Sequence, residues 1–210
     1  MRPARGYTPT RTLALPRQQG PRCYGLGMDR RGALSVLGMS LVGLYEGQAL
    51  GAVAKALTLP DLLKKSTSTL VIKAVAQRSS WVTLAGSQRI VTDTEARVEE
   101  LVAGLDPSAT QIMLRTLGGR VGNIGQIVEG EAELSVGETS LSFVTQFEPA
   151  IYAVTAMAQG HYPVVNQAGA RVLVTNRVLP ALLKRSGSAV ERLAGKKLTD
   201  ALAMVRAERR

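Results

Sequence analysis

The residues with the clearest chemical potential lie in a glycine-rich segment near the middle of the chain. It combines four glycines with three polar side chains, namely Gly118, Gly119, Gly122, Gly125, Arg115, Arg120 and Gln126. Backbone N–H groups of a glycine-rich turn can cradle an anion such as phosphate, and arginines beside the turn would balance its charge. These seven residues, together with His161 further along the chain, are therefore the candidate ligand-binding residues.

The glycine segment, residues 118–125, matches neither of the common phosphate-binding motifs. A Walker loop needs a lysine followed by serine or threonine, and a dinucleotide-binding loop needs the spacing G-x-G-x-x-G between a strand and a helix. A structural interpretation is therefore favoured over anion binding. In it, the glycines make a turn with positive φ and a close backbone approach at the point where a barrel closes.

His161 is the only histidine and the only candidate general base of the usual kind. A hydrolytic triad would have to combine it with Ser140 or Ser142 and with an acid such as Asp93, and no G-x-S-x-G motif supports this. A hydrogen-bonded or surface role is the plainer interpretation. We predict no catalytic residue. A hydrolase that uses His161 as base near the glycine segment is the alternative.

Three alternating carboxylates follow the glycine segment: Glu129, Glu131 and Glu133. They could form an edge that binds calcium, although a solvated loop is the simpler explanation. His161 has no partner at a spacing typical of a metal site. We predict no metal and no other cofactor.

The charge distribution argues against nucleic acid as a partner. The chain has 26 basic and 16 acidic residues and a net charge of +10, which alone would suggest a polyanion. Residues 57–170, however, hold 8 basic and 11 acidic side chains, and few aromatic residues that could stack on bases. The excess of basic over acidic residues lies in residues 1–31 and 171–210. Binding of an anionic polymer through the basic C-terminal segment is a second alternative.

The N-terminal region predicts an export signal. Residues 1–27 have no hydrophobic period and are predicted to be disordered, or to precede the true start at Met28. Residues 28–56 combine Arg30 and Arg31, an apolar run over 32–45 and small residues at the end, as a signal peptide does. The route could be the general or the twin-arginine pathway. A buried N-terminal helix is the alternative.

Three pairs of small residues would suit signal peptidase: Gly47 with Ala49, Ala52 with Ala54, and Ala54 with Ala56. Cleavage at any of them would remove Cys23, the only cysteine, so the mature chain would contain no disulfide. It would also contain no membrane span.

The remainder of the chain predicts a β domain, residues 57–175, with helical ends. A short helix over 57–66 has Thr58 as its N-cap and Pro60 in its first turn. Alternating or β-branched runs then predict a series of short strands: 69–78, 89–102, 111–116, 126–128, 139–146, 150–159, 162–165 and 170–175. The first run is apolar without interruption, as in a strand buried on both faces. Such a series favours a barrel or a sandwich.

The segment 176–210 is predicted to be a basic helical region, with helices over 178–184, 189–193 and 199–209. Leu202 and Val205 would share the buried face of the last helix.

The order of these elements resembles a family of uncharacterised secreted bacterial proteins. The resemblance covers about residues 57–175, and residues 118–130, with Gly118 and Gly119, are its most specific part; residues 158–164, which include His161, extend it. It implies an exported, small closed OB-like β barrel, similar in shape to the inhibitory domain of tissue inhibitors of metalloproteinases. Inhibition itself is not implied, because that activity uses an N-terminal cysteine. The resemblance implies no catalytic residues.

The sequence thus predicts a mainly β protein with helical termini, and the resemblance implies that its β domain is a small closed OB-like barrel followed by C-terminal helices. We expect a periplasmic, extracellular or cell-surface location and a non-enzymatic role in binding a protein or a small ligand. Nothing in the sequence identifies the partner.

Overall fold

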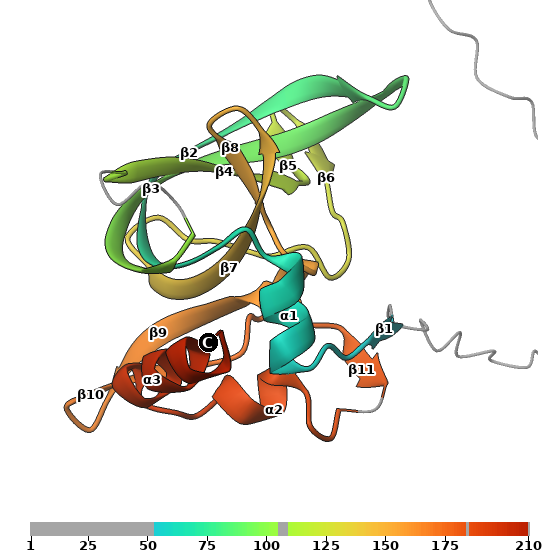
Figure 1. The fold of residues 1–210 in the computed structure, drawn as a ribbon. Helices are drawn as coiled ribbons and strands as arrows, with labels where there is room; N and C mark the ends of the chain where they lie inside the picture. The colour runs from blue at the N-terminus through green and yellow to red at the C-terminus, as the bar shows by residue number, and fades with distance from the viewer. Residues whose placement is uncertain (1–52, 105–108, 184, 210) are drawn as a thin grey trace, which may run out of the picture. The chain divides into compact units, whose positions relative to one another are not determined.

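The computed structural model describes residues 53–104, 109–183 and 185–209 (Figure 1). These residues are mainly β, with few helices, as the sequence predicts. The predicted extension and nearly all of the predicted signal peptide, residues 1–52, lie outside the described residues. Among the described residues, no helix is long and apolar enough to cross a membrane.

Seven strands form the main sheet in the order β10-β9-β7-β2-β3-β4-β8. Their bounds, in the same order, are Ala170–Leu173, His161–Gln167, Thr139–Glu148, Ser68–Leu84, Ser87–Ala103, Gln111–Leu117 and Ile151–Val154. Strand β7 also pairs with β8, so hydrogen bonds link β2, β3, β4, β8 and β7 in a ring (Figure 1). All neighbours in the ring are antiparallel except β4 and β8, which are parallel.

Two strands of the ring are buried on both faces over part of their length: β2 over its first half and β7 over residues 140–144. Leu70 and Ile72 point into the ring, where they pack with Leu114 and Val144. Val71 alternates with them and belongs to a second core with Leu141, Phe143 and Tyr162. This confirms the prediction drawn from the uninterrupted apolar run of the first strand. Because the backbone of each such strand carries side chains of both cores, the strand connects the two cores.

The second core lies between the sheet and three helices (Figure 1). These are α1 (Leu59–Lys65), α2 (Ala189–Leu193) and α3 (Leu198–Glu208). Helix α1 begins as predicted, because the side chain of Thr58 accepts a hydrogen bond from the backbone N–H of Asp61. In α3, Leu202 and Val205 are buried on one face, also as predicted.

The C-terminal segment differs from the prediction at its start. Residues 178–184 were predicted to be helical, but Ala181–Leu183 form strand β11, which pairs in parallel with β1 (Val53–Lys55). Pro180 has no N–H and disfavours a helical residue before it, while β1 supplies hydrogen-bond partners from far along the chain. Helical spacing over so short a run therefore gave the wrong element.

Three further boundaries differ from those predicted. Strand β2 continues to Leu84, so that β2 and β3 form a long hairpin. The strand predicted over 150–159 ends at Val154, and Met157–Gly160 form a 3-10 turn, η1. The glycine segment is itself a hairpin of β5 (Gly119–Val121) and β6 (Ile124–Gln126), with its tip at Gly122.

Candidate functional site

The first turn of the glycine segment fits tightly against the β2–β3 hairpin. Gly119 has φ +127°, and a Cβ there would lie 2.3 Å from Thr92 Oγ1 and 2.6 Å from Ser79 Oγ. The Thr92 hydroxyl donates a hydrogen bond to the Gly118 carbonyl, at 2.8 Å. Only glycine combines this backbone conformation with this close approach. The double glycine therefore places the β5–β6 hairpin against the sheet.

The arginines beside the glycine segment are engaged with protein groups. Arg115, on β4, donates from Nε to Asp93 Oδ1 at 2.7 Å and from Nη2 to Asp93 Oδ2 at 2.9 Å. This hydrogen-bonded pairing raises the pKa of Arg115 above its ordinary value. Arg120 is exposed and donates to the carbonyl of Gly122. The structure thus turns the Arg115 guanidinium towards a carboxylate rather than leaving it free for an anion.

Gln126 has a structural partner as well. Its side-chain oxygen accepts the backbone N–H of Ile90, at 3.0 Å, and so joins β6 to β3. Gly125 lies opposite Arg120 in the β5–β6 hairpin. The predicted binding residues of this region therefore do lie together, but most of their hydrogen-bonding groups hold the hairpin in place.

Two adjoining clefts flank the end of β4. The first, here called the glycine cleft, has a volume of about 560 Å³. It is lined by Gln77, Ser79, Thr92, Thr116, Leu117, Gly118, Gly119, Gln126, Ile127, Val128, Glu131, Ala132, Glu133, Leu134 and Val178. The second, the apolar cleft, has a volume of about 410 Å³. It is lined by Leu84, Ala85, Arg115, Thr116, Leu117, Glu131, Phe147, Ala153, Val154 and Met157.

The apolar cleft exposes large hydrophobic side chains to solvent. Phe147 is 52% exposed, Leu117 39% and Met157 37%. Single exposed apolar residues are ordinary, whereas several around one concavity are typical of a binding site. They come from β4, β7 and the turn η1, which the ring of strands brings together.

Glu131 lies where the two clefts meet, since it lines both of them together with Thr116 and Leu117. Its carboxylate accepts the backbone N–H groups of Ala132 and Leu117. Burial nevertheless raises the pKa of Glu131 above its ordinary value, because desolvation outweighs those hydrogen bonds. A half-buried carboxylate at the junction of two clefts is the most distinctive charged group of this region.

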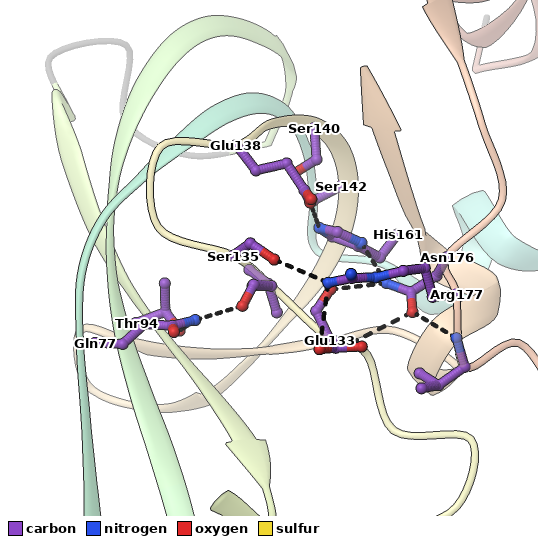
Figure 2. A network of polar contacts seen from close by, with 12 residues as sticks. Gln77, Thr94, Glu133, Ser135, Glu138, Ser140, Ser142, His161, Asn176 and Arg177 are labelled. Atoms are coloured by element: carbon purple, nitrogen blue, oxygen red, sulfur yellow. Dashed lines mark hydrogen bonds and ion pairs between the residues drawn. The ribbon is translucent and has the colours of Figure 1, made fainter. Parts of the chain in front are cut away.

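His161 lies apart from the glycine segment, in a buried polar network (Figure 2). Asn176 fixes its tautomer. The Asn176 oxygen accepts the N–H groups of Glu133 and Val178, and Nδ2 donates to the Glu133 carbonyl. Nδ2 also donates to His161 Nδ1, at 2.7 Å. The ring hydrogen therefore sits on Nε2.

The Nε2 atom of His161 faces a carboxylate without bonding to it. It lies 3.9 Å from Glu138 Oε1, and both atoms are buried with no hydrogen-bond partner among the described residues (Figure 2). Burial lowers the pKa of His161 to about 4 and raises that of Glu138 above its ordinary value. Both shifts favour the neutral forms. The His161 ring is thus neutral near pH 7.

The same network holds the irregular segment that forms one wall of the glycine cleft. This segment, residues 131–135, has no strand partner. Asn176 bonds to both backbone groups of Glu133, and Gln77 donates to the Leu134 carbonyl at 2.7 Å. Arg177 donates to the side chains of Glu133 and Ser135 (Figure 2). Side chains from β2 and from the C-terminal region therefore anchor this cleft wall.

The predicted site residues thus fall into two groups. Four of them line the clefts: Gly118, Gly119 and Gln126 line the glycine cleft, and Arg115 lines the apolar cleft. Arg120, Gly122, Gly125 and His161 line neither cleft, and His161 bonds to Asn176. No hydrogen bond among the described residues joins His161 to the glycine segment. Sequence reasoning missed Asn176 and Gln77, because each acts on a segment more than forty residues away and carries no local motif.

Several basic side chains of the C-terminal segment are paired with acids. Arg177 contacts Glu133, Arg192 contacts Glu208, and Arg206 contacts Glu100. These pairs reduce the positive charge that the segment presents to an anionic polymer.

The chain matches no family model, and it matches no curated protein.

Proposed function

We propose that this protein is an exported, non-enzymatic binding domain whose ligand occupies the joined glycine and apolar clefts. The observation that carries the proposal is the junction itself, where Thr116, Leu117 and Glu131 line both clefts. Concave sites with mostly apolar walls and a few placed polar groups are the usual form of small-ligand sites. The volumes of about 560 and 410 Å³ lie within the range of such sites.

We further propose that the ring of strands is a closed OB-like barrel. In chain order, the five strands β2, β3, β4, β7 and β8 pair as first-second-third-fifth-fourth and back to the first. The third and the fifth, β4 and β8, are parallel. This connectivity and this parallel pair are those of the five-stranded Greek-key barrel of the OB fold. The glycine segment then follows the third strand at one end of the barrel.

The non-enzymatic part of the proposal is supported by the state of His161. The ring is 1% exposed, uncharged near pH 7, and held by Asn176 away from both clefts. A general base must reach the proton that it removes, directly or through one water molecule. A role in supporting the cleft wall accounts for these contacts.

Nuclear magnetic resonance tests the proposed site directly. A library of small amphipathic compounds, screened by amide chemical-shift changes, is expected to give hits whose shifts concentrate at the lining of the two clefts. The variant Ala153→Phe would place a ring in the apolar cleft and should lose these hits. Ala170→Phe, at the start of β10 and in neither cleft, should keep them. Hits that map elsewhere, or hits unaffected by Ala153→Phe, would contradict the proposed site.

Export with cleavage after Ala49 is the second part of the proposal. Val53 pairs with Ala181, and Ala56 N–H donates to the Leu183 carbonyl. Gln159 also bonds to the Lys55 carbonyl and the Leu57 N–H. Cleavage after Ala54 would remove Val53 and Ala54 from the three-residue strand β1, and cleavage after Ala56 would remove the whole strand with the contacts of Lys55 and Ala56. Cleavage after Ala49 leaves all of these contacts intact.

Intact-mass analysis of the protein recovered from the envelope of an expressing bacterium tests this prediction. We expect a mature chain that begins at Leu50. A chain that begins at Lys55 or Leu57 would contradict the choice of cleavage site. A chain that retains Met1 or Met28 would contradict export.

A further inference from the structure

We propose that the apolar cleft binds a small organic cation, with an ammonium or guanidinium group at Glu131 and an apolar body against Leu117, Phe147 and Met157. This inference rests on the proposed function, because it assumes that the clefts hold a ligand. It adds the chemical class of that ligand and the residue that selects it.

The first step is that the negative charge of Glu131 is not balanced by a basic side chain. Its hydrogen bonds come from two backbone N–H groups, of Ala132 at 3.3 Å and of Leu117. These donors are neutral dipoles, so they orient the carboxylate but leave its charge in place. No ion pair joins Glu131 to any lysine or arginine among the described residues.

The second step is that the one basic side chain lining the apolar cleft is already neutralised. Arg115 is held by both carboxylate oxygens of Asp93, and Glu148 lies a further 3.8 Å from its Nη1. A bidentate pair of this kind is among the strongest charge-assisted contacts in proteins. With Arg115 and Asp93 balanced, Glu131 leaves the cleft with surplus negative charge, which excludes anions and attracts cations.

The third step concerns the walls. Leu117, Phe147 and Met157 leave more than a third of each side chain exposed around this cleft, and Leu84, Ala153 and Val154 complete the lining. A bare inorganic cation would gain nothing from these walls. A ligand that combines one positive group with an apolar body would cover them and would meet the carboxylate at the end of the cleft.

The raised pKa of Glu131 agrees with this assignment. Burial makes the carboxylate costly in the free protein. A bound cation would compensate that cost, because an opposite charge within a few ångströms favours the ionised form.

Three probes with six-carbon chains distinguish the contribution of the charge from that of the apolar body: hexylamine, hexan-1-ol and hexanoate. Each is titrated into the folded protein while the amide resonances of the apolar cleft are followed. We expect hexylamine to bind about tenfold more tightly than hexan-1-ol, since a hydrogen bond to a charged group is worth about one factor of ten or more. Hexanoate should bind most weakly.

Two charge-matched variants assign the effect to one residue. Glu131→Gln keeps an oxygen for the Ala132 and Leu117 N–H groups and should bind hexylamine and hexan-1-ol equally. Glu99→Gln removes the same charge from a residue that lines neither cleft, where the carboxylate contacts Arg171, and should keep the preference. Thermal melting of both variants checks that each remains folded.

The outcomes separate this inference from the proposed function. Equal binding of the three probes, or tightest binding of hexanoate, would overturn the inference while leaving the cleft as a binding site. The inference would also fall if Glu131→Gln kept the preference for hexylamine. A failure of all three probes to perturb the cleft would count against the proposed function as well. If a glycine-flanked lysine peptide bound more tightly than hexylamine, the proposal of a small cation would be overturned, and the ligand would be a lysine side chain of another protein.

Discussion

Replacing Asn176 with alanine is expected to lower the free energy of unfolding by about 4 kcal/mol, because it leaves several buried polar groups without partners. Asn176 is 2% exposed and bonds to the N–H and carbonyl of Glu133, the N–H of Val178 and the ring of His161. Because these groups are buried, water cannot replace the hydrogen bonds that the substitution removes. The loss should appear in urea unfolding at pH 7, and hydrogen exchange should become faster over residues 131–135, the cleft wall.

Two further variants separate the amide from general effects of substitution. Asn166→Ala removes an exposed asparagine from β9 and should change the free energy of unfolding by less than about 0.5 kcal/mol. Asn176→Asp keeps the acceptor for the two N–H groups but removes the donors to the Glu133 carbonyl and to His161. A stability of Asn176→Ala close to that of Asn166→Ala would show that Asn176 does not anchor the cleft wall.

The second large effect concerns pH and His161. Burial lowers the pKa of this residue to about 4, below the value of about 6.5 expected in the unfolded chain. Above pH 6.5 the ring is neutral in both states and has no effect. As the pH falls from 6.5 towards 4, the unfolded chain binds a proton that the folded protein does not bind. Stability is therefore lost across this window, by up to about 3 kcal/mol.

The comparison that isolates His161 is the pH profile of His161→Asn, whose side-chain oxygen can replace Nδ1 as the acceptor from Asn176. Glu138, whose pKa is raised by burial, acts in the opposite sense and is present in both proteins. Urea unfolding between pH 7 and pH 4 should show a steeper loss for the natural chain than for the variant. Parallel profiles would contradict the burial of a neutral ring.

Much of the strand framework could be predicted from the sequence, because it depends on local patterns. The alternation in β3 and β4, the N-cap at Thr58 and the buried run in β2 each have a physical cause that acts within a few residues. The error at β11 has the opposite origin. Its partner β1 lies more than a hundred residues earlier, and no local pattern records that pairing.

The candidate site was predicted in part for the same reason. Gly118 and Gly119 could be recognised from the sequence, because only glycine suits a backbone that has positive φ and leaves no room for a Cβ atom. Glu131 was visible only as one of three alternating carboxylates; its place at the junction of two clefts depends on the ring of strands. Asn176 and Gln77 act through ordinary polar side chains on distant backbone. Nothing in their surroundings marks them.

Because β2 and β7 contribute side chains to both cores, the role of the basic C-terminal segment cannot be tested by deleting it. Val71 of β2 and Leu141 and Phe143 of β7 share one core with the buried residues of α2 and α3, so removing these helices would expose apolar side chains of two strands that also line the ring. A truncated chain would lose its folding cooperativity rather than a binding tail. Questions about the positive charge of this region are therefore answerable only by charge reversal at exposed lysines and arginines, with the hydrophobic helix faces left in place.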